Sequence, residues 1–346
     1  GNLASVCSTQ AERTGPEVVE ELAGRIRDND RITVHLGAQL EAVEGYVGNF
    51  VLHTGQGDIE TGAIVVATGA EEYRPTEYSY GQDDRVLTQR ELGKRLAEEP
   101  LNADTVAMIQ CVGSRTKENP MCSRICCTSA MRNAIDIKDS SPKTDVYVFF
   151  KDMRTYGFKE ELYRRASELG VVFIRMNDDE MPEMTEEGGK LVLKANDIIL
   201  GEEVSVNADM VALSTGIRPH PENDDIAQML KVPVSKDGFF LEAHQKLRPV
   251  DFATEGVYLA GLAHWPKFAE ESIAQAAGAA ARAMTVISQD TLETEGIIAA
   301  VNEDLCDGCG VCEGVCEYNA IEIVEIEGAP EKKKAEVNEG LCKGCG

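Results

Sequence analysis

The positions of the cysteines constrain this chain more than any other feature of the sequence. Of its eleven cysteines, four lie within residues 111–127, six lie within residues 306–345, and Cys7 stands alone. The opening residues GNLASVCSTQ have neither the basic start nor the apolar block of a secretory signal. In a chain that is not exported, clustered thiols indicate metal or redox chemistry rather than structural disulfides. The fold must therefore bring the thiols of each group close together in space.

The C-terminal group has the spacing of a bacterial iron–sulfur run. CDGCGVCEGVC places four cysteines at C-x2-C-x2-C-x3-C, namely Cys306, Cys309, Cys312 and Cys316. A second run begins with Cys342 and Cys345, and residues 318–328 predict a small strand pair over the cluster. Zinc is the alternative metal for such thiols. We predict a ferredoxin-like module with 4Fe-4S clusters, although Glu317 stands where such runs usually carry proline.

The chain begins with Gly1 rather than methionine and ends in LCKGCG, inside the second run. We therefore expect a piece of a longer protein. In a two-cluster ferredoxin, the fourth cysteine of one run binds the other cluster. The piece then holds two sets of three ligands: Cys306, Cys309 and Cys312, and Cys316, Cys342 and Cys345. We expect neither cluster to be stably filled in the piece, and both to be filled in the full-length parent.

The first group of cysteines interrupts a pattern typical of nucleotide binding. Residues 105–110 (TVAMIQ) predict a strand, and residues 123–138 predict the following helix. The glycine-rich loop GxGxxG that would hold a dinucleotide between them is absent. Nicotinamide binding by residues 101–218 is therefore not expected. Four cysteines stand in this place instead: Cys111, Cys122, Cys126 and Cys127.

A helix N-terminus favours anions, so the feature that binds a pyrophosphate can also stabilise an iron–sulfur–thiolate cluster. We predict one 4Fe-4S cluster on these four thiols, with Arg115 and Arg124 adding positive charge. Cys122 and Cys126 share a helical face if the helix begins early enough. Two alternatives remain: ordinary buried or free cysteines, and a redox-active disulfide. The disulfide lacks the C-x2-C spacing, and adjacent cysteines would form a strained ring.

The rest of the chain has the pattern of an α/β protein. Helices are expected at residues 17–30 and 88–99, and short strands at residues 31–36, 42–54 and 64–69. From residue 105 strands and helices alternate, which predicts a parallel sheet with crossover helices. Strands that end in Thr-Gly at 68–69 and 215–216 indicate two related lobes. Residues 256–287 predict a strand, a loop and a helix rich in small residues, which suits either tight packing or a flat cofactor.

With these motifs, the sequence resembles the A-type subunit of heterodisulfide reductase, an iron–sulfur flavoprotein, or a bacterial relative. The matching stretches are GN (1–2), EGYVGNF (44–50), IVVATGAEEYRPTEY (64–78), VLTQREL (86–92), CVGSR…NPMCSRICC (111–127), STGIRP (214–219), GVYLAGLAHWPKFAEESIAQA (256–276) and the ferredoxin run. The resemblance implies an α/β, two-lobed FAD/NAD(P)-type Rossmann-like fold, similar to thioredoxin reductase, plus a truncated ferredoxin-like module. It divides the chain into residues 1–100 and 219–290 for FAD, 101–218 for a degenerate nucleotide-binding-like domain with the cysteine cluster, and 296–346 for ferredoxin.

The resemblance also implies which residues meet FAD. The family's own GxGxxG lies upstream of residue 1, and the remaining candidates are Gly1, Asn2, Thr68, Gly69, Ala70, Gly261, Leu262, Lys267, Glu271, Ser272, Ile273 and Gln275. Leu262 stands where the wider class of flavoproteins carries an acidic residue. His264 and Lys267 are either neighbours of the flavin or exposed loop residues. No catalytic nucleophile or general base is required.

The function implied is electron transfer between FAD and 4Fe-4S clusters in a heterodisulfide reductase-like complex, with bifurcation of electron pairs and ferredoxin or another protein as donor or acceptor. The alternatives are a flavoprotein subunit of a quinone-modifying membrane complex, an NAD(P)-dependent disulfide reductase, and an electron-wire subunit without flavin. A net charge of −26 opposes binding to nucleic acid and anionic lipids, and suits cationic protein partners or simply solubility. No apolar stretch is long enough to span a bilayer, and we expect a cytoplasmic protein.

Overall fold

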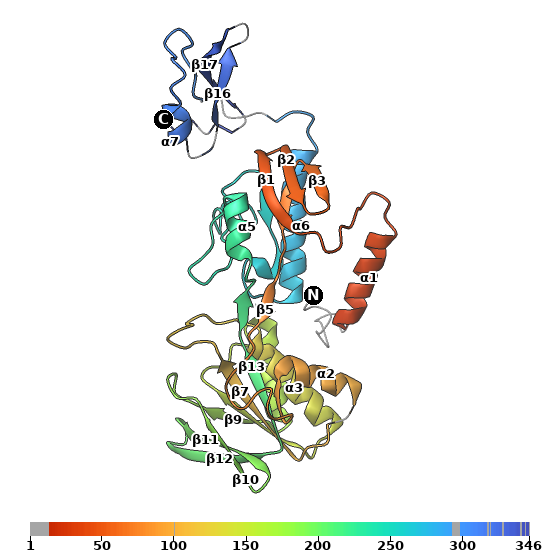
Figure 1. Ribbon diagram of the computed structural model, residues 1–346. Coiled ribbons are helices and arrows are strands. Elements are labelled where there is room, and N and C mark those ends of the chain that lie inside the picture. Colours follow the sequence, from red (N-terminus) through yellow and green to blue (C-terminus); the bar gives the residue numbers. More distant parts are fainter. Residues whose placement is uncertain are drawn as a thin grey trace.

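The computed structural model describes residues 14–99, 101–292, 298–316, 318, 320–326, 329–339, 341–342 and 344–345, with the backbone alone at 329–331. Figure 1 shows these residues in three parts. We name them the cysteine lobe (residues 73–216), the α6 lobe (residues 14–69 and 220–292) and the C-terminal module (residues 298–345). The chain passes between the two lobes along strands β5 (Ala70–Glu72) and β14 (Ile217–Pro219), which pair antiparallel.

The cysteine lobe is built on a parallel sheet. Its strands, in the order β6-β13-β7-β8-β9, are Val86–Thr88, Met210–Thr215, Thr105–Val112, Asp145–Phe150 and Val172–Arg175. Every neighbouring pair in this sheet runs parallel, as the alternation of strands and helices predicts. Strand β7 is buried along almost its whole length, because both faces of a sheet of this kind are covered.

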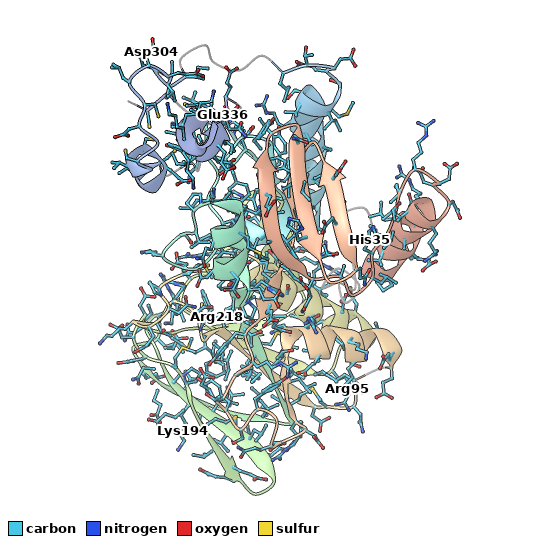
Figure 2. All side chains as sticks on the ribbon, turned by 45° about the horizontal axis from the view of Figure 1, so that its top comes forward. His35, Arg95, Lys194, Arg218, Asp304 and Glu336 are labelled. Carbon is cyan, nitrogen blue, oxygen red and sulfur yellow. The ribbon has the colours of Figure 1, made fainter. Side chains whose placement is uncertain are left out.

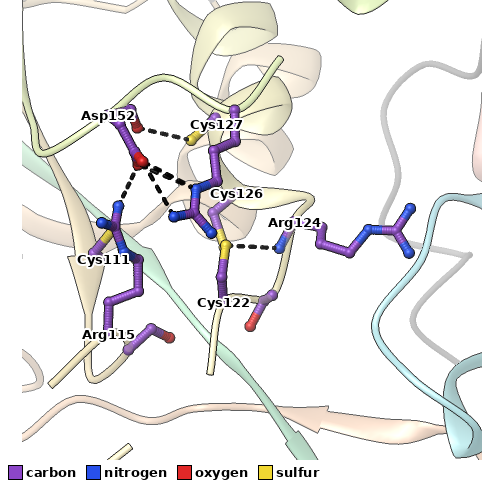
Figure 3. Close-up of a pocket in the computed structure, with 10 residues that line it drawn as sticks. Cys111, Arg115, Cys122, Arg124, Cys126, Cys127 and Asp152 are labelled. Atoms are coloured by element: carbon purple, nitrogen blue, oxygen red, sulfur yellow. Dashed lines mark hydrogen bonds and ion pairs between the residues drawn. The ribbon is translucent and has the colours of Figure 1, made fainter. Parts of the chain in front are cut away.

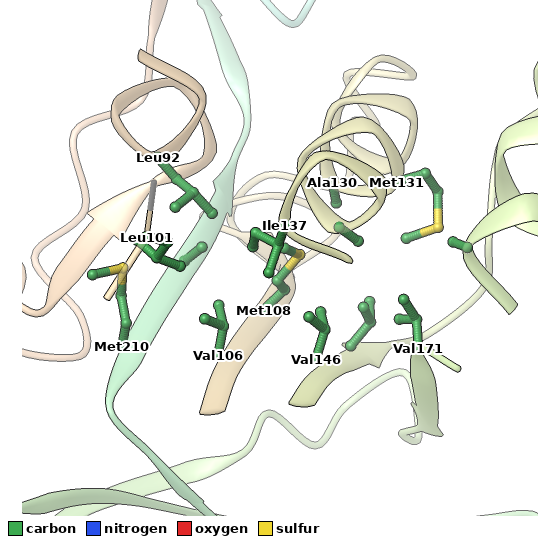
Figure 4. Close-up of a cluster of buried hydrophobic side chains, with 14 of the residues drawn as sticks. Leu92, Leu101, Val106, Met108, Ala130, Met131, Ile137, Val146, Val171 and Met210 are labelled. Carbon is green, nitrogen blue, oxygen red and sulfur yellow. The ribbon is translucent and has the colours of Figure 1, made fainter. Parts of the chain in front are cut away.

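Helices cover one face of this sheet and a second sheet covers the other. The helical elements are α2 (Gln89–Glu98), α3 (Cys126–Ser140), η2 (Gly157–Lys159) and α4 (Glu160–Glu168). Opposite them lies an antiparallel sheet of β10 (Glu183–Glu187), β11 (Lys190–Asp197) and β12 (Glu202–Ala208). On the helical side, Val106 and Met108 of β7 pack beneath Met131 and Ile137 of α3 (Figure 4). This packing fixes the position of α3 over the sheet.

The α6 lobe holds a shorter parallel pair beneath a long helix. Its elements are α1 (Gly15–Arg27), the antiparallel strands β1 (Leu40–Tyr46), β2 (Asn49–Thr54) and β3 (Gly57–Thr61), strand β4 (Ile64–Val66), α5 (Asn223–Leu230), β15 (Val257–Leu259), η3 (Gly261–Ala263) and α6 (Ala269–Ile287). Strands β4 and β15 run parallel, so the loops that follow them meet at one edge. Helix α6 packs against both strands through Ala279 and Ala283, whose small side chains permit close approach.

The C-terminal module contains a short helix and a hairpin. These are α7 (Val311–Val315), β16 (Ile321–Ile326) and β17 (Ala329–Val337), the two strands pairing antiparallel. Gly308 has φ +66°, and a Cβ there would lie 2.4 Å from the Lys333 carbonyl oxygen, so the loop needs glycine. In the described part of the chain, no helix is both long and apolar enough to cross a membrane.

Two expectations about the elements are wrong. Residues 31–36 form no strand, and Leu36 is 84% exposed, so these alternating apolar residues have no described strand to pair with. Figure 2 labels His35, which belongs to this connection between α1 and the β1–β3 sheet. Helix α3 begins only at Cys126, so Cys122 precedes the helix and does not share a helical face with Cys126. The expected helices at 17–30 and 88–99, the hairpin at 42–54 and the β7–α3–β8 unit are confirmed.

The core beneath α3 gives the first prediction. Ile137 is fully buried between α3 and the parallel sheet, so Ile137→Ala removes apolar contacts and leaves a cavity. We expect the free energy of unfolding to fall by about 2–5 kcal/mol, measured by urea denaturation. The matched control is Ile199→Ala on the exposed β11–β12 turn, 69% exposed, which should change stability by less than about 0.5 kcal/mol. Equal effects of the two substitutions would contradict the assigned core.

Candidate functional site

The loop after β7 is held in an unusual backbone conformation. Left-handed φ values occur at Cys111 (+64°), Gly113 (+66°), Arg115 (+55°) and Arg124 (+65°). For residues other than glycine, such conformations cost about 1–3 kcal/mol each and persist where surrounding contacts enforce them. Here Asn119 Nδ2 donates to the Gly113 carbonyl at 2.8 Å, and the Arg115 N–H donates to the Met121 carbonyl at 3.2 Å. The loop is therefore a defined structure rather than a loose connection.

The four cysteines of this loop line one pocket (Figure 3). Cys111 comes from the end of β7, Cys122 from the loop, and Cys126 and Cys127 from the first turn of α3. The pocket is narrow, with a cavity volume of about 10 Å³. The Cys122 sulfur accepts from the Arg124 N–H at 3.4 Å. Helix α3 has no side-chain cap, so its first N–H groups are left facing this region.

Two arginines and one aspartate of the pocket lining form a charged group beside the thiols. Arg115 interacts with the Cys111 thiol and Arg154 with the Cys122 thiol. Both guanidinium groups pair with Asp152, Arg154 at 3.1 Å, so the three side chains carry one net positive charge. Arg154 and Asp152 lie on the loop after β8, which carries no signal in the sequence for this role. The position of Arg115 agrees with the sequence-based expectation.

Arg124, in contrast, does not direct its charge at the thiols. Its guanidinium points away from the cysteines (Figure 3) and bonds Glu271 Oε1 at 2.7 Å. The expectation that Arg124 adds positive charge to the cysteine site is wrong for its side chain. The cause is the left-handed backbone at this residue, which turns the Arg124 N–H toward Cys122 and sends the side chain the opposite way. Arg154 supplies the second positive charge instead.

Burial favours the neutral form of three of these thiols. Desolvation raises the pKa of Cys127 to about 11, and burial also raises the pKa of Cys111 and of Cys126, the latter well above its ordinary value. A buried thiolate is stable only when its charge is shared with a metal or a paired cation. All ten cysteines that the structure describes carry free thiols.

The donor set of this pocket, four thiols, is of the kind that binds a polynuclear cluster. Among the described residues, no group of three or more His, Cys, Asp or Glu side chains is placed to hold a single metal ion. Ligands of an iron–sulfur cluster stand farther apart than ligands of one ion, because the inorganic core lies between them. The Ser114 hydroxyl lines the pocket, is 3% exposed, and finds no hydrogen-bond partner within the described ranges. Such an orphaned donor suits a sulfide or thiolate acceptor.

A second candidate site lies where β4 and β15 end. Gly69 follows β4 with φ +81° and Gly261 follows β15 with φ +73°. A Cβ at either glycine would meet no described atom within 4 Å, so both positions leave open space beside the backbone. The Gly261 N–H donates to Gln275 Oε1 at 2.9 Å, which ties this loop to α6. The geometry fits a flat ligand that approaches glycine backbone at the carboxyl edge of parallel strands.

Lys267 is the charged residue of this second site. It is 8% exposed, and its Nζ donates to Gln275 Oε1 at 2.5 Å and lies 3.2 Å from His264 Nδ1. The alternative of an exposed loop residue is therefore wrong for Lys267. Burial lowers the pKa of Lys267 to about 8, against the opposing effect of Glu271 and Glu242. His264 is half-buried, and its pKa is also lowered, first by burial and then by Lys267.

The other residues expected at this site have different positions. Glu271 Oε2 accepts the Phe268 N–H at 2.8 Å at the start of α6, and Ser272 Oγ donates to the Phe268 carbonyl. Thr68 is exposed, Ala70 is half-buried, and Ile273 is 55% exposed. Gly1 and Asn2 lie outside the described residues.

The two candidate sites are in contact. Met121 and Ile125 from the cysteine loop belong to one hydrophobic cluster with Ala70 and Leu262, which follow β4 and β15. Phe239, Ile217 and Trp265 complete the cluster, the two rings lying 5.2 Å apart between centroids. Across the junction, Arg218 of β14, labelled in Figure 2, donates to the Gly113 carbonyl at 2.9 Å. The cysteine pocket and the β4/β15 edge therefore form one continuous packed region.

In the C-terminal module, backbone N–H groups point at three of the sulfurs. Ala335 donates to Cys306 Sγ at 3.3 Å, Ala320 to Cys316 Sγ at 3.3 Å, and Ala299 to Cys342 Sγ at 3.2 Å. Cys312 is half-buried, whereas Cys309 and Cys345 are exposed. N–H···S bonds of this kind stabilise thiolate ligands and tune cluster potentials.

Comparison with known proteins identifies the relatives of this chain. A family model described as a 4Fe-4S binding domain matches residues 299–322. An iron–sulfur A-type subunit of the CoB--CoM heterodisulfide reductase of Methanopyrus kandleri is 40% identical over 288 residues, which cover 78% of this chain and 44% of that protein. The A-type subunit of the H(2):CoB-CoM heterodisulfide,ferredoxin reductase of Methanothermobacter thermautotrophicus is 40% identical over 290 residues, covering 78% and 43%. The chain thus spans less than half the length of these relatives.

Solved structures resemble the fold. Thioredoxin reductase of Lactococcus lactis aligns with a TM-score of 0.55 at 17% identity, covering 84% of this chain and 88% of that one. Thioredoxin reductase of T. acidophilum aligns with a TM-score of 0.54 at 15% identity, covering 83% and 86%. The expected Rossmann-like, two-lobed flavoprotein fold is confirmed by this likeness.

The buried Lys267 predicts a pH dependence. Because its pKa in the fold is about 8 rather than 10.5, the unfolded chain still holds a proton between those pH values that the folded chain has released. The free energy of unfolding therefore contains a contribution that rises with pH across this window. Lys267→Met removes this contribution, and the exposed control Lys236→Met keeps it. Urea unfolding at several pH values measures the difference, and identical pH profiles for the two variants would refute the assignment.

Proposed function

Over most of its length the chain belongs to the family of heterodisulfide reductase A-type subunits, and from this premise we propose that it is an electron-transferring component of an oxidoreductase. Electrons pass between FAD, bound at the β4/β15 edge, and 4Fe-4S clusters. Residues 1–100 and 219–290 form the FAD domain, residues 101–218 the cluster domain, and residues 296–346 the ferredoxin module. The observation that carries the proposal is the single apolar cluster that Met121 and Ile125 share with Ala70 and Leu262.

The FAD site is supported by the open glycine backbone and the buried cation. Bound FAD accepts electrons in pairs and releases them singly. Gly69 and Gly261 let the ring approach the backbone, while Lys267, held by Gln275, faces it with a positive charge. The positive end of the α6 dipole, near Glu271–Ile273, would favour negative charge on the ring. Thr68, Ala70 and Leu262 line the loops, and Gly1 and Asn2 complete the proposed set.

The proposed role of the cluster domain is electron transfer, and it supplies no catalytic side chain. Cys111, Cys122, Cys126 and Cys127 hold one 4Fe-4S cluster, and Arg115 and Arg154 offset its negative charge. The Ser114 hydroxyl, which has no hydrogen-bond partner among the described residues, would be available to donate to a sulfur of such a cluster. Residues of both lobes exclude water between the cluster and the β4/β15 edge, which keeps an electron from reaching solvent oxidants. No side chain acts as nucleophile or general base.

The ferredoxin module provides a second exit for electrons. Its proposed ligands are Cys306, Cys309, Cys312, Cys316, Cys342 and Cys345, shared between two clusters in the full-length protein. The names of several relatives pair a heterodisulfide with ferredoxin as substrates of one complex. We extend this to the present protein: a cytoplasmic complex with further subunits, in which electron pairs divide between a ferredoxin-type acceptor and a disulfide-reducing partner. Membership of a quinone-modifying complex is the second candidate, and the proteins that copurify distinguish the two.

The cysteine pocket is tested in the full-length protein with two cysteine variants. Cys126→Ser should remove about four irons per chain and one EPR signal of the reduced protein, because one buried ligand is lost. Cys312→Ser is the matched comparison, since it alters a ferredoxin ligand and should leave the signal of the 111–127 cluster intact. Iron analysis and EPR of the two variants measure this.

Two results would contradict the proposal. If Cys126→Ser retained the full iron content and every EPR signal, the 111–127 cluster would be excluded. If the full-length protein released no FAD on denaturation, the electron-wire alternative without flavin would replace the flavoprotein.

A further inference from the structure

A set of polar and aromatic contacts joins the cysteine loop to the start of α6. Arg124 lies between Cys122 and Cys126, yet its guanidinium crosses to the other lobe and bonds Glu271 Oε1 at 2.7 Å. Both side chains are about one-third exposed, at 34% and 35%. The other oxygen of Glu271, Oε2, accepts the Phe268 N–H at 2.8 Å. One carboxylate therefore both caps α6 and receives the arginine of the cysteine loop.

Neighbouring residues repeat this connection. Lys159 Nζ bonds Glu270 Oε1 at 2.7 Å and lies 4.0 Å from the centre of the Phe268 ring, with only 14% of the lysine side chain exposed. Tyr156 packs beside Phe268 with ring centroids 6.0 Å apart, and the Arg124 guanidinium lies 5.3 Å from the Tyr156 ring centre. We call these six residues the latch: Arg124, Tyr156, Lys159, Phe268, Glu270 and Glu271.

The contacts of the latch lie between the cysteine lobe and the α6 lobe. The chain connects the lobes only through the short pair β5 and β14 in the described residues, so contacts between side chains must fix their orientation. Exposed ion pairs contribute little to stability. Here the pairs are partly buried, share a charge-assisted hydrogen bond, and lie on aromatic rings, which strengthens each contact.

We infer that Arg124 is a positioning residue that holds the cysteine loop against the first turn of α6, and so fixes the separation between the 111–127 cluster and the flavin. The inference rests on the proposed function for the identity of the two cofactors. The contacts themselves depend only on this chain's side chains. In the sequence Arg124 lies between the proposed cluster ligands, but its side chain bonds a residue of the other lobe.

Lys267 provides an independent readout of the latch. The charged and titratable groups that face it are Glu242, Glu271, Arg124 and His264. Arg124 repels the Lys267 ammonium and also engages Glu271, which attracts it. Removing the arginine charge therefore raises the pKa of Lys267 from its value of about 8. A purely structural role for Arg124 at its own backbone would not produce this change.

The test uses Arg124→Gln in the full-length protein. The matched control is Arg164→Gln on α4, where an exposed arginine pairs with Glu161 and Glu168 of its own helix. In Arg124→Gln, amide hydrogen exchange at residues 113–125 and 268–272 should accelerate by about tenfold, because one stabilising contact between the lobes is lost. Flavin and iron contents should be unchanged. The pH midpoint of the flavin absorption spectrum should move upward, and reduction of the cluster after photoreduction of the flavin should slow.

Partner variants guard against misfolding. Glu271→Gln keeps an oxygen that can accept the Phe268 N–H while removing the charge, and should accelerate the same amides. The double variant Arg124→Gln with Glu271→Gln should exchange its amides no faster than either single variant, because both remove the same contact. Arg124→Lys should exchange more slowly than Arg124→Gln, because it keeps the positive charge. Exchange rates in Arg124→Gln that equal those in Arg164→Gln would overturn the latch, whichever cofactors are bound. Wild-type protein without flavin absorption would instead overturn the proposed function, and the exchange measurement would still decide the latch.

Discussion

The contact between the cysteine loop and the loops that follow β4 and β15 is the constraint on which the rest of this structure depends. Met121 and Ile125 meet Ala70 and Leu262 in one apolar cluster, and this packing sets how near the thiols lie to the glycine-lined edge. Each side of the contact is the carboxyl edge of a parallel sheet, where loops converge and side chains from several strands can meet. The thiol pocket and the glycine-lined edge are thereby joined by one apolar cluster.

The buried and half-buried charged side chains of this interior lie beside groups of opposite charge. The thiol pocket combines Arg115 and Arg154 with Asp152, and Arg115 also pairs with Asp178. The second site places Lys267 between acceptors and keeps it nearly buried, which lowers its pKa. Because burying an isolated charge is unfavourable, each of these groups needs a partner of opposite charge. Lys267 has Glu271 and Glu242 as such partners, and the proposed anionic cluster would be a partner of the required sign for the arginines of the thiol pocket.

The sequence predicted some parts of the site well because their signals are local. Cysteine spacing marked both groups of thiols, and the β7–α3 pattern located the first group at a helix start, although α3 begins at Cys126 and leaves Cys122 in the loop. Residues 31–36 misled because alternation of apolar residues describes a strand only when another strand pairs with it. Arg154 and Asp152 could not be found, since they come from a loop 25 or more residues away from Cys127.

By itself, the sequence determined the class of chemistry: thiols at ferredoxin spacing, thiols in place of a glycine-rich loop, and glycines after two parallel strands. These features are set by neighbouring residues, so they survive without knowledge of the fold. Only the tertiary structure decided which charges face which site. Arg124 lies among the cysteines in the sequence, yet its left-handed backbone directs it to Glu271 on the other lobe. The direction of a side chain depends on packing between distant segments, and no spacing along the chain encodes it.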